Sequence, residues 1–390
     1  MPAEARVAAR AAAIEPFHVM ALLGRARELE AAGHHVVHME IGEPDLPTPA
    51  LVSEAAARAV AEGRTHYTPS LGLPALREAI AGYYAEHFGV TVASERVIVT
   101  PGASGALLLA MAATLDPGDE VLLADPGYPC NRNFARLLAV EARAVPVEAA
   151  QRYQLTPEAV ARHFGPRTRA VMVASPSNPT GTLIEPAALA AIARDVTARG
   201  AHLLVDEIYQ GLVYEQAPRT ALALAQPSFV INSFSKYFHM TGWRVGWLVV
   251  PPGYTAAVER LAQNLFLAAP TPGQYAALAA LSPPALAEYE RRRLLFKQRR
   301  DYLVPALDAL GFEVGPAPEG AFYVYAGCGR YTDDSLAFAL RLLEEAKVAV
   351  TPGVDFGTHG AATHLRFAYT TGMDELERGV ARLERYLRGA

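Results

Sequence analysis

The feature that most constrains this chain is the regular alternation of short apolar runs with helical patterns through its middle. Residues 96–100 and 119–126 are apolar runs that flank a helical stretch at 103–115. Similar runs follow at 169–176, 202–209, 228–234 and 244–250, and another helical stretch covers 185–200. Near-continuous apolar strands with helices between them are typical of a parallel sheet that helices cover on both faces. We therefore expect an α/β fold with a mostly parallel sheet.

The texture of the sequence changes on either side of this central region. Residues 13–37 hold a helical pattern, and from about residue 284 a long charged helix leads into a mixture of helices and strands. We expect a large α/β domain at residues 46–283 and a smaller α+β domain at 284–390. The N-terminal segment, residues 1–45, is expected to add an arm and a helix to the smaller domain. A chain of 390 residues is long enough for two or three domains.

Composition excludes several classes of protein. Apolar residues make up 51% of the chain and charged residues 19%, which indicates a globular protein with a large core. The net charge is −5 and no basic block occurs, so a nucleic-acid partner is not expected. Two cysteines, Cys130 and Cys328, indicate neither a disulfide framework nor a metal site.

The same sequence shows no targeting or membrane signal. The first ten residues lack the apolar core of a secretory signal, and no apolar run reaches the ~18 residues of a membrane span. We therefore expect a cytoplasmic protein without a membrane partner.

Polar residues follow several predicted strands, where ligands gather in open parallel sheets. The turn TPGASG at 100–105 opens a helix, and its backbone N–H groups can hold an anion. It matches neither the dinucleotide fingerprint nor the P-loop, so those two ligand classes lose support. Asn178 and Asp206 follow the next two strands of the central region. Each has a plain alternative, a proline-rich turn for Asn178 and a helix cap for Asp206.

Lys236 and Arg244 follow the strand at 228–234, eight residues apart. A buried lysine near another cation has a lowered pKa and becomes a usable amine nucleophile. An arginine can hold an anionic group through two hydrogen bonds. A lone lysine after a strand is usually a surface residue, but Asn178, Asp206 and Tyr209 precede it at other strand ends.

Together these motifs resemble the class I/II pyridoxal-phosphate aminotransferases of the aspartate aminotransferase fold (fold type I). The resemblance covers nearly the whole chain and rests on IGEPD (41–45), HYTPSLGLPALREAI (66–80), SNPTG (177–181), DEIY (206–209), SFSK (233–236) with TGWRVG (241–246), and LRFAY (365–369). It implies a large domain with a mostly parallel seven-stranded sheet, a smaller α+β domain, and a homodimer with shared active sites. It also implies pyridoxal 5′-phosphate as cofactor and a role in amino acid metabolism. The reaction would move an amino group from an L-amino acid to a 2-oxo acid by a ping-pong aldimine/ketimine mechanism.

The resemblance implies a role for each matching residue. Lys236 would form a Schiff base with the cofactor aldehyde and later move the substrate proton. Asp206 would pair with the pyridinium nitrogen, and Tyr209 and Asn178 would hydrogen-bond the phenolic oxygen. Tyr128 would stack on the ring.

The phosphate and the substrate would have separate sets of residues. The phosphate would be held by the backbone of Ala103 and Ser104 and by the side chains of Ser233, Ser235 and Arg244. Tyr67 would reach the phosphate of the neighbouring subunit. The substrate α-carboxylate would bind Arg366, with the backbone of Gly42 and the side chain of Asn178 beside it.

Departures from the family pattern concern the substrate side chain. Some relatives that accept dicarboxylates have a lysine where this chain has Ser104, and others use an arginine near residues 266–274, a segment without a basic residue here. Arg132 and His18 could still supply a positive charge, although surface or structural roles are the simpler interpretation. Phe17 and Tyr128 suit an apolar or aromatic side chain. We therefore expect neutral or aromatic substrates rather than strictly dicarboxylic ones.

Two other functions share these residues. A carbon–sulfur β-lyase of the same fold needs the same lysine, aspartate and carboxylate-binding arginine, so the sequence separates it poorly from a transaminase. A non-catalytic cofactor-binding effector module of a transcription regulator would need a DNA-binding domain, and only about 35 residues precede the MEIGEPD motif at 39–45.

Overall fold

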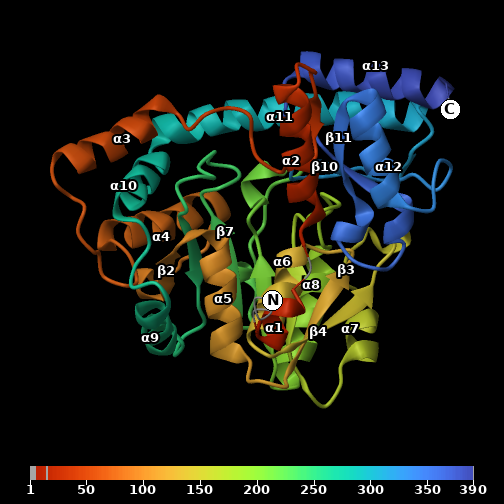
Figure 1. Ribbon diagram of the computed structural model, residues 1–390. Coiled ribbons are helices and arrows are strands. Elements are labelled where there is room, and N and C mark those ends of the chain that lie inside the picture. Colours follow the sequence, from red (N-terminus) through yellow and green to blue (C-terminus); the bar gives the residue numbers. More distant parts are fainter. Residues whose placement is uncertain (1–5, 15, 390) are drawn as a thin grey trace.

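The computed structural model describes residues 6–14 and 16–389 and contains two sheets (Figure 1). Residues 1–5 and 15 of the expected N-terminal segment lie outside the described residues. The larger sheet has seven strands in the order β2-β8-β7-β6-β5-β3-β4 within the described part of the chain. Its strands are β2 (Val97–Thr100), β3 (Glu120–Asp125), β4 (Glu141–Pro146), β5 (Thr168–Ala174), β6 (His202–Asp206), β7 (Ser228–Ser233) and β8 (Gly246–Val249).

Strand directions confirm the expected mostly parallel sheet. The pairs β3–β4, β3–β5, β5–β6 and β6–β7 are parallel, while β8 runs antiparallel to both β2 and β7. The edge strand β4 was not predicted, because its side chains are mostly exposed and its sequence, EARAVP, has no apolar run.

Two predicted strands are shorter than expected. The run at 202–209 stops at Asp206, whose carboxylate accepts a hydrogen bond from the Ile208 backbone and so forms a local turn. The run at 244–250 begins at Gly246, because Arg244 has a φ of 54° and cannot extend the strand.

Helices pack on both faces of the larger sheet because successive strand residues point to opposite faces. In β6, Leu204 joins the core beneath α5 (Gly102–Thr114) and α9 (Thr255–Leu265), while Leu203 and Val205 join the core on the other face. The remaining helices of this region are α3 (Ala50–Ala61), α4 (Pro74–Phe88), α6 (Pro129–Leu137), α7 (Pro157–His163), α8 (Pro186–Ala198) and α10 (Thr271–Ala280). A short helix, α1 (Ala9–Ala12), lies against α6.

The smaller sheet has five strands in the order β1-β11-β12-β10-β9 among the described residues. These strands are β1 (Val37–Met39), β9 (Glu313–Val314), β10 (Tyr323–Gly327), β11 (Val348–Pro352) and β12 (His364–Ala368). The helices around them are α2 (His18–Ala31), α11 (Pro283–Ala309), α12 (Ser335–Arg341) and α13 (Met373–Gly389), and α13 lies along α11 at the top of Figure 1. Because β1 pairs in parallel with β11, part of the N-terminal segment joins this sheet. The domain boundaries at residues 45 and 283 stay a prediction.

No helix within residues 6–14 and 16–389 has both the length and the apolar character needed to cross a bilayer.

Candidate active site

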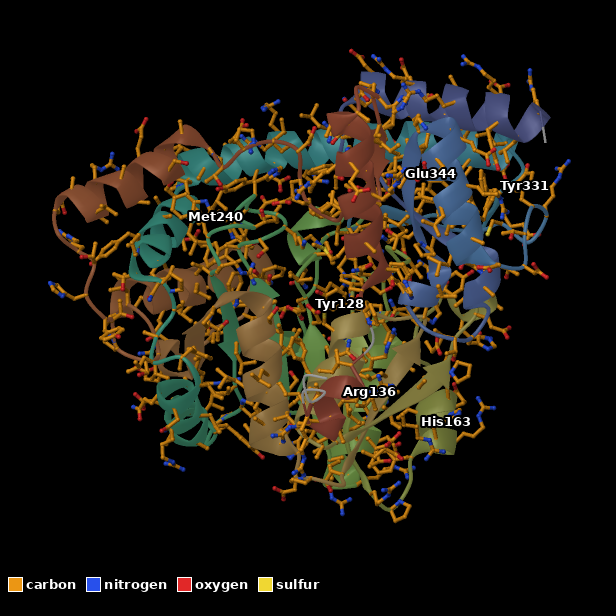
Figure 2. All side chains as sticks on the ribbon, in the orientation of Figure 1. Tyr128, Arg136, His163, Met240, Tyr331 and Glu344 are labelled. Atoms are coloured by element: carbon orange, nitrogen blue, oxygen red, sulfur yellow. The ribbon has the colours of Figure 1, made fainter. Side chains whose placement is uncertain are left out.

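The candidate site lies where the parallel strands β5, β6 and β7 end. Ala174 and Asp206 are partners in register, and Asp206 is also the partner of Ile231, so these strand ends are neighbours. A cavity of about 280 Å³ opens beyond them. Tyr128, at the start of α6, lines this cavity near the middle of Figure 2. Residues of the smaller sheet, including Tyr323 and Arg366, complete the wall.

Most of the predicted site residues line this one cavity. They are Phe17, Gly42, Ala103, Ser104, Tyr128, Asn178, Asp206, Tyr209, Ser235, Lys236, Arg244 and Arg366. Two predicted residues do not line it. Ser233 is buried behind Ser235, and Tyr67 is 80% exposed in the segment between α3 and α4.

Lys236 projects into the cavity from the loop that follows β7. Its Nζ atom donates a hydrogen bond of 2.6 Å to the Gly42 carbonyl oxygen, and it lies 5.9 Å from the centre of the Phe322 ring. Burial, together with the nearby charge of Arg366, lowers the pKa of Lys236 to about 8. A substantial fraction of the amine is therefore neutral, and nucleophilic, at mildly basic pH.

Asp206 presents a buried carboxylate at the end of β6. One of its oxygens, Oδ1, accepts a 3.0 Å hydrogen bond from the Ile208 backbone N–H. Burial raises the pKa of Asp206 to about 6, while that hydrogen bond and the charge of Lys236 act in the opposite direction. A buried carboxylate of this kind is well suited to pair with a cationic group that enters the cavity.

Tyr209 and Tyr323 form one wall of the cavity. Their hydroxyl oxygens lie 2.8 Å apart in a hydrogen bond. A Cβ atom on Gly42 would overlap the Tyr323 hydroxyl, so this position requires glycine. Sequence reasoning missed Tyr323, because an aromatic residue in an apolar strand gives no signal that it faces a ligand.

The N-terminus of α5 and the loop after β7 form the end of the cavity that suits an anion. A Cβ on Gly102 would overlap the Arg244 guanidinium, and a Cβ on Gly246 would lie 2.8 Å from the Ala103 nitrogen. The two glycines thus let Arg244 and the first backbone N–H groups of α5 approach the same space. Ser233 Oγ lies 2.9 Å from Ser235 Oγ and 3.1 Å from the Val245 carbonyl oxygen, which orients Ser235.

Arg366 enters from β12 on the opposite side. Its Nη1 donates 2.9 Å to Asn178 Oδ1, and its Nη2 lies 3.1 Å from Thr351 Oγ1 and 2.5 Å from the Glu40 carbonyl oxygen. The guanidinium stacks 4.2 Å from the centre of the Tyr323 ring. Within the described residues its buried Nε atom has no hydrogen-bond partner. Glu40 and Thr351 were not predicted, since each meets Arg366 only through pairing in the smaller sheet.

Arg132 and His18 do not line this cavity and make contacts elsewhere. Arg132 Nη2 donates 3.0 Å to the Asp355 carbonyl oxygen, and Arg132 lines a neighbouring cavity. The backbone N–H groups of His18 and Val19 donate 2.9 Å each to the Asp355 carboxylate, which caps the start of α2. Sequence reasoning missed Asp355, because its partners lie more than 300 residues away.

Comparison with known proteins decides the family. The sequence model of the family 'aminotransferase class I and II' matches residues 34–383. The chain belongs to this family. It is 40% identical to a valine–pyruvate aminotransferase of Mycobacterium tuberculosis, over 98% of each chain. It is 38% identical to an aspartate/prephenate aminotransferase of Thermus thermophilus, over 97% of this chain and 98% of the other.

Solved aminotransferases share the whole fold. An aminotransferase from Mycobacterium tuberculosis superposes with a TM-score of 0.95 at 40% identity, covering 99% of this chain and 100% of the other. The aspartate aminotransferase of Thermus thermophilus with maleate gives 0.92 at 36% identity, covering 98% and 99%. The chain is therefore a pyridoxal-phosphate-dependent aminotransferase whose substrates are amino acids and 2-oxo acids.

The residues of the cavity fit this cofactor chemically. An arginine and a helix N-terminus suit the phosphate, a buried carboxylate suits the ring nitrogen, and an amine with a lowered pKa suits the aldehyde.

Proposed function

We propose that Lys236, Asp206 and Tyr209 are the catalytic residues of this aminotransferase. The observation that carries the proposal is the presence of a lysine of lowered pKa and a buried carboxylate in one cavity of about 280 Å³. When bound, the cofactor supplies an electrophilic aldehyde and a ring that accepts electrons.

Each catalytic residue has a task that follows from its surroundings. Lys236 Nζ accepts the proton from the substrate Cα, because burial favours the neutral form of this amine. Asp206 keeps its carboxylate where a cationic ring nitrogen offsets the cost of burying the charge. Tyr209 donates its hydroxyl proton to an oxygen in the cavity, and Tyr323 holds that hydroxyl in place.

The remaining predicted residues bind the cofactor. The backbone N–H groups of Ala103 and Ser104, with Ser235 and Arg244, would hold the phosphate, and Ser233 orients Ser235. Tyr128 would pack on the ring, and Asn178 would bind its phenolic oxygen; both residues line the cavity.

Arg366, Gly42 and Asn178 are proposed to bind the substrate α-carboxylate, with Phe17 beside the substrate side chain. The unpartnered Nε of Arg366 supports this role, since an incoming carboxylate can accept its hydrogen bond.

We propose neutral amino acids as donors. Beyond Lys236, the described lining holds two cations, Arg244 and Arg366, and the phosphate and the α-carboxylate occupy both. Phe17 and the apolar residues Val19, Met20, Ile41 and Leu107 belong to the same lining. The name of the valine–pyruvate relative agrees with this preference.

A half-reaction screen tests the substrate proposal. Purified holoenzyme is mixed with each amino acid separately, and the change in the visible absorbance of the cofactor is followed. We expect valine, leucine or phenylalanine to react at least about tenfold more efficiently than aspartate or glutamate, because the described lining of the cavity holds no cation beyond Lys236, Arg244 and Arg366. Faster reaction with the dicarboxylates would overturn the proposal. Release of pyruvate and ammonia from cysteine conjugates without a 2-oxo acid, faster than transamination, would reassign the reaction to the β-lyase.

We also propose a homodimer in which Tyr67 reaches the phosphate of the partner. The 80% exposure of Tyr67 in the single chain supports this arrangement. Mixing Lys236→Ala chains with Tyr67→Ala chains should restore activity above either variant alone, because mixed dimers contain one complete site. No restoration, in a mixture shown to exchange subunits, would contradict shared sites.

A further inference from the structure

A second cavity, of about 370 Å³, lies behind the segment that carries the catalytic carboxylate. Asp206 and Tyr209 line the active-site cavity, whereas Glu207 and Gln210 line the second one. The start of α8 and residues 213–224 form its other walls. One short turn therefore presents side chains to two cavities.

The polar end of this second cavity contains an unsatisfied amide. Gln210 is only 2% exposed, and neither its Nε2 nor its Oε1 has a hydrogen-bond partner within the described residues. The amide lies beside the Glu207 carboxyl group and lowers its pKa as a hydrogen-bond donor does, but the contact falls short of the geometry of a full hydrogen bond. A buried amide without full hydrogen bonds is unfavourable, so a ligand that donates and accepts hydrogen bonds here would be stabilised.

Glu207 adds no negative charge to the cavity at neutral pH. Its carboxyl group accepts hydrogen bonds from the Ala221 backbone N–H at 2.6 Å and the Thr220 hydroxyl at 3.0 Å. Burial nevertheless raises its pKa to about 8, so the group is largely protonated at pH 7. An anionic ligand would therefore meet little repulsion from this wall.

The lining of the cavity combines apolar and charged residues. Its apolar residues include Phe88, Leu183, Ile184, Leu189, Val213 and Leu224. Its charged residues include the exposed Arg219, for which no hydrogen bond or ion pair with another described side chain is found. Glu185, also exposed in the lining, lies 4.0 Å from Arg152, which pairs more closely with Glu319. Arg219 is thus the cation that the described lining offers to a ligand.

We propose that this cavity is a second small-molecule site, which takes a compact monocarboxylate with an apolar body and a hydroxyl or amide at its far end. Arg219 binds the carboxylate of the ligand, the apolar lining residues pack against its apolar body, and Gln210 hydrogen-bonds its far end. A cavity of this size, mostly apolar with a few polar groups, is typical of small-ligand sites. Because Gln210 and Tyr209 are adjacent, occupancy also affects the surroundings of the cofactor.

The test uses 3-fluoro-4-hydroxyphenylacetate as probe and ¹⁹F NMR as readout. Arg366→Ala holoenzyme is titrated, because that substitution removes carboxylate binding at the active site. We expect saturable binding of one equivalent per chain and a shift of the visible cofactor absorbance that saturates with it. Adding Arg219→Ala should raise the dissociation constant about tenfold, because a charge-assisted contact is lost. Adding Leu189→Trp, which fills the cavity, should abolish binding.

Arg260→Ala in the same background serves as the matched control, since Arg260 is an exposed arginine on α9 that lines neither cavity. It should leave binding of the probe unchanged. Absence of saturable binding to the Arg366→Ala holoenzyme would overturn the proposal. Binding of the probe to the Arg219→Ala and Leu189→Trp variants as tight as to the Arg366→Ala parent would also overturn it.

Discussion

Asn178 and Arg366 are joined by a 2.9 Å hydrogen bond from Arg366 Nη1 to Asn178 Oδ1. Asn178 follows β5 of the larger sheet, and Arg366 lies on β12 of the smaller one. The proposed cofactor-binding and substrate-binding residues thus orient each other across the two sheets. Such mutual support is what a preorganised site requires.

Lys236→Ala should abolish both transamination and the visible absorbance of the bound cofactor, because the chain then lacks the amine in the cavity. A coupled transaminase assay measures the first effect, and absorption spectroscopy of the purified variant with added cofactor measures the second. Lys297→Ala is the control, since Lys297 pairs with Asp301 on α11 and should leave both unchanged. Turnover by Lys236→Ala at the wild-type rate would refute the assignment.

Asp206→Asn should lower kcat by about a hundredfold or more, because a neutral amide cannot pair with a cationic ring nitrogen. Cofactor binding should weaken as well, which equilibrium dialysis measures. Asp195→Asn, on the surface of α8, provides the comparison. A kcat within twofold of wild type would mean that another group stabilises the ring nitrogen.

Arg366→Ala should reduce kcat/KM for all amino acids by roughly 10- to 150-fold, the equivalent of about 1.5–3 kcal/mol for a charge-assisted contact. The visible cofactor absorbance should persist, since the lysine is untouched. Arg366→Lys should recover part of the loss, because it restores the charge without the bidentate geometry. With Arg132→Ala we expect no comparable loss for neutral substrates. An unchanged kcat/KM in Arg366→Ala would place the carboxylate elsewhere.

Glu207 should make the enzyme less stable as the pH rises. Its pKa is raised from 4.5 in the unfolded chain to about 8 in the folded protein, so the folded protein retains a proton that the unfolded chain releases. Its contribution to stability is fully present below pH 4.5 and is lost as the pH rises towards 8. Glu207→Gln removes this titration, so its melting temperature should fall less than that of wild type across that window. Thermal denaturation of both holoenzymes at several pH values measures this, and parallel curves would contradict it.

Local patterns in the sequence were sufficient for the α/β class and for most of the site. Apolar runs predicted six of the seven described strands of the larger sheet, because a strand that is buried on both faces needs such a run. The edge strand β4 was missed, since an exposed strand can be polar. Motifs around Asn178, Asp206, Lys236 and Arg366 predicted residues that share one cavity.

Other features depended on contacts between distant segments. Tyr323 faces the site because β10 pairs with β12, and Glu40 and Thr351 meet Arg366 through the same sheet. The second cavity arises where residues 213–224 fold over Glu207 and Gln210.

The sequence by itself determined the α/β class, since apolar periodicity is a local property, and its resemblance to the aminotransferase family supplied the residues proposed for the site. Only the tertiary structure decided which groups meet, how burial lowers the pKa of Lys236 and raises that of Asp206, and that the Gln210 amide lacks a full hydrogen bond among the described residues. The physical reason is that desolvation and hydrogen-bond pairing depend on every segment that packs around a group, including segments far away along the chain.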